Sequence, residues 1–122
     1  MLWILLALGG GAGAVARFTI STRVYSRTGP GFPWGTFVVN ALGSFLLGVV
    51  MTGLADTPLG TQLIALLAIG FLGDFTTFST FAYESVMLAR DGQWRRALVY
   101  LLGSTASALA AVMVGLACGA WL

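Results

Sequence analysis

Four apolar segments make up most of this chain, and each is long enough to cross a lipid bilayer as a helix. They run over about residues 2–20, 34–54, 61–89 and 97–120, with short polar segments between them. Only 8% of the residues are charged, whereas soluble domains carry about 25%. The pattern predicts one all-α membrane domain over residues 1–122, with four transmembrane helices and little outside the bilayer.

The composition excludes several kinds of site. The chain has no His and no Lys, and Cys118 is its only cysteine. A His/Cys metal site, a Ser-His-Asp triad and a disulfide framework are therefore ruled out, and we expect no catalytic residues and no enzyme. The six arginines are spread along the chain, so the net charge of +2 indicates no nucleic-acid partner. Cys118 lies among Gly, Ala and Leu and is expected to be a small buried residue.

The first apolar segment has two interpretations. Its residues Ala14–Ala16 resemble a signal-peptidase site, but no positive charge precedes the apolar core. Removal of a leader would also leave a three-span protein, so we favour a first transmembrane helix that ends near Ile20. A polar loop with Arg23, Arg27 and the turn formers Gly29-Pro30-Gly31 is expected to follow.

Polar residues gather near the middle of the third segment. Residues 70–81 read GFLGDFTTFSTF and combine glycines, one acid and several hydroxyls at a depth where lipid cannot satisfy polar groups. We therefore predict a helix break around residues 73–77. Such breaks free carbonyl oxygens that can coordinate a small cation. The alternative is an unbroken helix whose Thr and Ser side chains bond back to the preceding turn.

Aromatic and neutral polar side chains recur at helical spacing around the predicted break. Phe78 and Phe81 share one face, next to Thr77, Thr80 and Glu84. Two polar stripes occupy other segments: Thr36, Asn40 and Ser44, and Tyr100, Ser104 and Ser107. The positive edges of aromatic rings beside hydroxyl and amide donors can line a path for a small anion. The alternatives are simple packing for the rings and interhelical hydrogen bonding for the polar residues.

Small residues at a spacing of four suggest close helix contacts. Gly9 and Gly13 are four residues apart in the first segment, and Gly115 and Gly119 are four apart in the last. This spacing lets two helix backbones approach each other in a membrane. A chain with 17 glycines contains such pairs readily, so the spacing alone is a weak signal.

Three motifs in this chain resemble those of the bacterial CrcB/Fluc fluoride channels. The first is Gly9–Ala14 followed by Arg17-Phe18, the second is Gly35–Asn40 with Gly43-Ser44-Phe45, and the third is Gly70–Gly73 with Thr76–Phe81. Length, number of spans and motif order agree over essentially the whole chain. The resemblance implies a fluoride-selective channel in the bacterial inner membrane, which passively exports cytoplasmic fluoride and lowers its toxicity.

The resemblance also implies an assembly and a pore. The expected assembly is an antiparallel dimer of four-helix subunits with two narrow pores near the subunit interface. The partner is an identical copy or an inverted paralogous subunit. Fluoride is expected to contact the rings of Phe78 and Phe81 and the amide of Asn40. Further pore-lining or supporting positions are Ser79, Thr80 and Tyr100.

Two more roles follow from the same resemblance. The backbone carbonyls of Gly73 and Thr76, from both subunits, would hold a structural sodium ion at the dimer centre that is not transported. Arg17 matches the arginine of the first motif and is expected to anchor the end of the first helix near a vestibule.

Two features depart from the family pattern. Asp74 occupies a position where the family usually has Gly or another small residue. We predict that Asp74 points away from the anion path or pairs with an arginine. All six arginines also fall on or next to one side of a four-span arrangement. The positive-inside rule favours that side in the cytoplasm and both termini outside.

Two other functions compete with the channel. One is a small four-span exporter in which Glu84 or Asp74 carries a proton. Exporters of that kind place a Glu in the first span, and this first span contains no acid. The other is a scaffold subunit whose Gly and Ser residues only pack helices.

Overall fold

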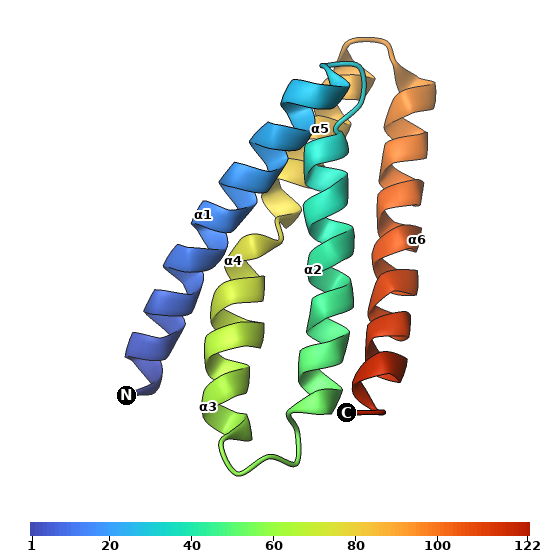
Figure 1. Ribbon diagram of the computed structural model, residues 1–122. Helices are drawn as coiled ribbons and strands as arrows, with labels where there is room; N and C mark the ends of the chain where they lie inside the picture. The colour runs from blue at the N-terminus through green and yellow to red at the C-terminus, as the bar shows by residue number, and fades with distance from the viewer.

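The computed structural model describes residues 1–122 and consists of helices joined by short loops (Figure 1). In chain order the elements are α1 (Leu2–Thr28), α2 (Trp34–Gly53), α3 (Gly60–Ile64), the π-helical η1 (Ala65–Leu72), α4 (Gly73–Phe75), α5 (Phe78–Arg90) and α6 (Trp94–Gly119). The elements from α3 to α5 follow one another as a single broken span. Four helices are therefore long and apolar enough to cross a membrane, and the predicted all-α class with a broken third span is confirmed.

The first helix is longer than predicted. Residues 21–28 continue α1 instead of forming a loop. Their hydroxyl groups bond back to carbonyls of the preceding turn, for example Ser21 to Arg17 at 2.7 Å and Thr28 to Val24 at 2.9 Å. The helix ends only at Gly29, whose φ of 73° takes the backbone out of the helical region. α6 likewise begins at Trp94, before the predicted start at residue 97.

Glycines allow the helices to approach each other closely. A β-carbon on Gly13 of α1 would overlap the carbonyl of Phe71 in η1. On α6, a β-carbon on Gly115 would overlap the carbonyl of Phe45 in α2. Because glycine has no side chain, α1 can pack closely against the broken span, and α6 can pack closely against α2.

Many large apolar side chains are exposed, as a membrane protein requires. Only 21 of the 122 residues are buried, and a small core of Val39, Leu72 and Phe75 lies between α2 and the broken span. Cys118, expected to be buried, is instead exposed on α6. Its small size permits burial, but this face of α6 has no neighbouring helix in the chain.

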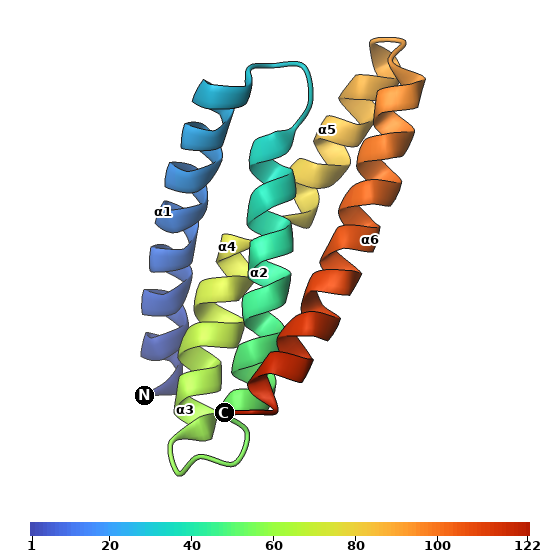
Figure 2. The same ribbon diagram turned by 45° about the vertical axis from the view of Figure 1, so that its right-hand side comes forward.

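Tryptophans mark the two ends of the helical layer. Trp34 and Trp94 lie at the end that holds the α1–α2 and α5–α6 loops, whereas Trp3 and Trp121 lie at the end that holds both termini (Figure 2). Tryptophan concentrates at both membrane–water interfaces. The 20 residues of α2 span about 30 Å, the thickness of the hydrocarbon core. The chain is a multi-pass membrane protein.

Candidate functional site

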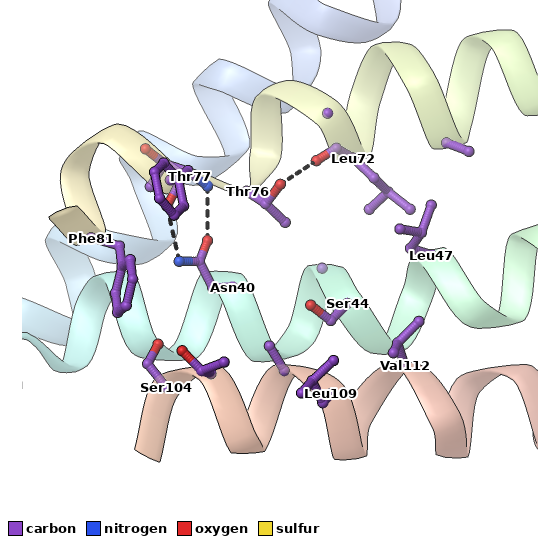
Figure 3. Close-up of a pocket in the computed structure, with 16 residues that line it drawn as sticks. Asn40, Ser44, Leu47, Leu72, Thr76, Thr77, Phe81, Ser104, Leu109 and Val112 are labelled. Carbon is purple, nitrogen blue, oxygen red and sulfur yellow. Dashed lines mark hydrogen bonds between the residues drawn. The ribbon is translucent and has the colours of Figure 1, made fainter. Parts of the chain in front are cut away.

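The break in the third span is held by a side-chain amide of α2. Thr76 and Thr77 are extended, with φ −82°, ψ 162° and φ −149°, ψ 120°. The N–H of Thr77 donates to Oδ1 of Asn40 at 2.8 Å, and Nδ2 of Asn40 donates to the Thr77 carbonyl at 3.0 Å (Figure 3). In a continuous helix the Thr77 N–H would instead close a turn on the carbonyl of Gly73. The Asn40 amide thus supplies hydrogen-bond partners for the N–H and the carbonyl of Thr77. The Gly73 carbonyl is left without the Thr77 N–H as a donor.

A second threonine contact restarts the helix. The hydroxyl of Thr77 caps α5 by accepting the N–H of Thr80 at 3.2 Å. The same hydroxyl lies 3.0 Å from the Thr80 hydroxyl and 3.4 Å from the Ser79 hydroxyl. Ser79 and Thr80 therefore belong to the first turn of α5 and bond to its cap.

A pocket of about 470 Å³ opens beside the break, between α2, the broken span and α6 (Figure 3). Its polar lining consists of amide and hydroxyl side chains: Asn40, Ser44, Thr76, Thr77, Ser104 and Thr105. Phe78 and Phe81 complete one side, and no charged side chain lines the pocket. Tyr100, Ser79 and Thr80 lie outside this lining. An ion here would meet neutral donors and aromatic rings.

The two phenylalanines differ in their surroundings. Their ring centroids are 6.0 Å apart, and the Phe81 ring also lies 5.3 Å from that of Tyr100. Phe78 is 80% exposed although it borders the pocket. A single chain therefore leaves this wall of the pocket uncovered.

Beyond the pocket, three hydroxyls converge on the carboxylate of Glu84. Oε1 accepts hydrogen bonds from Tyr25 at 2.9 Å and from Thr36 at 3.0 Å, and Oε2 accepts one from Tyr100 at 2.7 Å. Tyr100 is completely buried, and its hydroxyl points to Glu84. This cluster joins α1, α2, α5 and α6, and sequence reasoning missed it as a unit. The polar stripes through Thr36 and Tyr100 were the available signal.

Arg17 and Asp74 both lie near the break, but they do not meet. Nη1 of Arg17 donates to the carbonyl of Thr76 at 3.2 Å. Because α1 continues to Thr28, Arg17 lies well inside this helix and not at its end, which corrects the expected position. Asp74 lies against Gly10 of α1 and outside the pocket lining. The Asp74 carboxylate therefore lies beside α1 and borders no part of the pocket.

Comparison with known proteins places the chain in a family. Residues 4–116 match the family model described as CrcB-like protein, Camphor Resistance (CrcB). This chain belongs to the CrcB family. The matched residues run from the first turn of α1 nearly to the end of α6, so every residue of the pocket and of the Glu84 cluster lies within the CrcB region.

Curated CrcB relatives are similar over nearly their whole length. A protein of Geobacter sulfurreducens is 44% identical over 112 residues, which cover 91% of this chain and 90% of the relative. A protein of Acidobacterium capsulatum is 42% identical over 97% of this chain and 94% of its own length. A protein of Thermus thermophilus is 42% identical over 84% of this chain and 82% of its own length. All three are named fluoride-specific ion channel FluC.

The oxygen atoms at the break could hold a small hard cation. No group of three His, Cys, Asp or Glu side chains could do so. The Gly73 carbonyl is freed by the Asn40–Thr77 pair, and the Thr76 carbonyl accepts a bond from Arg17 but keeps a second lone pair. Hard cations prefer oxygen ligands of this kind, but two carbonyls from one CrcB chain do not complete a coordination shell.

Proposed function

We propose that this CrcB-family chain forms a fluoride-selective channel in the bacterial inner membrane. In this role it passively exports cytoplasmic fluoride and so lowers its toxicity. The observation that carries the proposal is the pocket at the helix break, whose lining offers one amide, several hydroxyls and two aromatic rings but no charge. Relatives at 42–44% identity are named fluoride-specific ion channels, which supports fluoride as the ion.

Neutral donors at close range favour a small anion. An ion entering the pocket must exchange its water shell for protein groups, and selectivity depends on how well those groups replace water. The amide of Asn40, the surrounding hydroxyls and the ring edges of Phe78 and Phe81 approach a compact anion closely. Chloride is larger and gains less from the same contacts.

The membrane potential supplies the driving force. Fluoride enters an acid-exposed cell as neutral HF, which dissociates in the more neutral cytoplasm and leaves the anion trapped. A passive path lets an inside-negative potential expel the anion, at about 2.3 kcal/mol per charge for each 100 mV. No coupled ion is needed in this scheme.

The proposed assembly is an antiparallel dimer with a central sodium ion. Two observations support a second subunit on the face that carries the break: Phe78 borders the pocket yet is 80% exposed, and Gly73 is exposed beside it. The carbonyls of Gly73 and Thr76 from two subunits would together provide four oxygen ligands. The bound sodium would fasten the two broken spans together and is not transported.

The test is fluoride efflux from liposomes at a clamped potential, with and without a proton gradient. We expect purified protein to release fluoride at the same rate at equal and unequal pH. The rival proton-coupled exporter requires the gradient and loses transport in Asp74→Asn or Glu84→Gln. Asp74 lies outside the pocket, so we expect Asp74→Asn to retain fluoride efflux within about twofold of the wild type. Strict dependence on the proton gradient would contradict the channel.

A further inference from the structure

A tight turn between α5 and α6 carries three exposed arginines. Arg90 ends α5, and Arg95 and Arg96 are the second and third residues of α6. Gly92, with a φ of 75°, reverses the chain between the two helices. Asp91 is the only acid in this turn, so three positive charges are opposed by a single negative charge.

A hollow of about 530 Å³ lies at the start of α6. Its lining consists of five consecutive residues: Gly92, Gln93, Trp94, Arg95 and Arg96. We refer to it as the turn hollow. The Asp91 side chain lies outside this lining, so the turn hollow contains two guanidinium groups and no carboxylate.

The two guanidinium groups keep most of their hydrogen-bond donors free. Nη1 of Arg96 donates to Oε1 of Gln93 at 2.8 Å and to the carbonyl of Gly31 at 3.2 Å. Arg96 is the one arginine of the pair that donates within the chain, and these bonds leave its Nε and Nη2 for a ligand. Arg95 keeps all five N–H groups. A guanidinium group binds a phosphate through two parallel N–H···O bonds, so the lining suits a phosphate.

Trp94 sets the depth of the turn hollow in the membrane. Its side chain is 65% exposed, and it lies with Trp34 at the end that holds the α1–α2 and α5–α6 loops (Figure 1). Tryptophan concentrates at the level of the lipid headgroups. Arg95 and Arg96 follow Trp94 directly, so their guanidinium groups lie at the level of the lipid phosphates.

An exposed apolar strip continues from Arg95 toward the hydrocarbon layer. Val99 and Leu102 follow Arg95 at i+4 and i+7 and therefore share its face of α6. Their side chains are 58% and 66% exposed. This face is opposite the one that buries Ala97 and Ser104, so no helix of the chain covers it. A positive group above an apolar strip matches a phospholipid better than a soluble phosphate.

We propose that the turn hollow binds the headgroup of an anionic phospholipid. Arg95 and Arg96 hold the phosphodiester, and an acyl chain lies along Val99 and Leu102. A zwitterionic lipid carries its own cation beside the phosphate, so it gains less from two arginines. The site is independent of the ion that the pocket at the break conducts.

Native mass spectrometry of the purified protein in detergent tests the site, with phosphatidylglycerol or phosphatidylcholine added in increasing amounts. We expect phosphatidylglycerol to bind at concentrations at which phosphatidylcholine does not. Arg95→Gln combined with Arg96→Gln should weaken phosphatidylglycerol binding at least about tenfold. The matched control combines Arg23→Gln with Arg27→Gln, which removes the same charge from exposed positions outside the turn hollow. This control should change binding by less than about twofold.

Equal weakening by the two double variants would show that the lipid responds only to total charge, and would overturn the turn hollow as a site. Arg95→Gln alone separates binding from folding, because this exposed side chain donates no bond within the chain. It should weaken phosphatidylglycerol binding at least about threefold and leave the melting temperature without added lipid unchanged. Inorganic phosphate at millimolar concentration should not displace the lipid. Displacement would show a site for free phosphate and would overturn the lipid proposal.

Discussion

Asn40 is the residue at which the fold and the candidate pore depend on each other. Its side-chain amide exchanges two hydrogen bonds with the backbone of Thr77, which lies 37 residues away in the sequence. Nδ2 has a second N–H, and the side chain also lines the pocket. One amide can therefore stabilise the broken backbone and still donate to an anion.

Replacing Asn40 by Ala should destabilise the protein. The change leaves the N–H and the carbonyl of the buried Thr77 without these partners, at about 1–3 kcal/mol for each unsatisfied group. We expect the free energy of unfolding to fall by about 2–4 kcal/mol, measured by denaturation in detergent. Ser44→Ala is the matched control, because Ser44 lines the same pocket from α2 without a hydrogen bond to the break. Equal stability of the two variants would contradict this role of Asn40.

Phe81 should contribute its ring edge and not merely its volume. Phe81→Ile keeps a bulky apolar side chain but removes the quadrupole that presents a positive edge to an anion. We expect fluoride efflux from liposomes to fall at least about tenfold, equivalent to about 1.4 kcal/mol in the barrier. Phe18→Ile on α1, where the ring is 71% exposed and outside the pocket lining, should leave efflux unchanged. Full efflux in Phe81→Ile would mean that the ring only packs.

At the scale of elements, the contact between α1 and η1 depends on glycine. Gly13→Ala would place a methyl group on the Phe71 carbonyl, so α1 must move away from the broken span. This shift also strains the bond from Arg17 to Thr76. We expect a clear loss of thermal stability in detergent for Gly13→Ala. Gly11→Ala lies two residues away on the same helix with no atom within 4 Å of the new methyl group, and should be neutral or slightly stabilising. Equal melting temperatures of the two variants would show that α1 and η1 accommodate the added methyl group without loss of stability.

Hydropathy was enough to predict the four spans, and the polar run Gly73–Thr77 was enough to predict the break. The end of α1 was predicted too early because Arg23, Arg27 and the turn formers of residues 29–31 indicated one polar loop. In the structure the helix continues through both arginines, and the hydroxyls of Ser21, Ser26 and Thr28 bond back to carbonyls of the same helix. Gly29, and not the first polar residues, therefore marks where the helix ends.

The Glu84 cluster could not be derived from the sequence. Spacing placed Thr36 and Tyr100 on polar stripes of separate helices, and Glu84 on a third. Whether these stripes face one another depends on the rotation of each helix about its axis. That rotation is set by contacts such as Gly115 against Phe45, which no single segment encodes. The resemblance gave Tyr100 as a pore-lining or supporting position; in this chain its hydroxyl bonds to Glu84, and its ring lies 5.3 Å from that of Phe81.

At the scale of the whole molecule, the proposed channel requires a second subunit against the break. Phe78 and Gly73 are exposed beside the pocket, and two carbonyls at the break lack a full coordination shell. We expect that protein purified and reconstituted with potassium in place of sodium will show fluoride efflux at least about tenfold slower, because the subunits are held together less firmly. Chemical crosslinking should show fewer dimers in the same samples. Unchanged efflux and dimer content without sodium would remove the proposed ion.

The neutral pocket at the break is proposed to conduct fluoride in preference to chloride. The most direct measurement is the flux of each ion from liposomes that contain the purified chain, at one imposed potential and with no proton gradient. We expect rapid fluoride efflux and a fluoride-to-chloride ratio of at least about 100, which corresponds to about 2.7 kcal/mol between the two barriers. Equal fluxes of the two ions, or no fluoride flux from well-folded protein, would contradict the proposal.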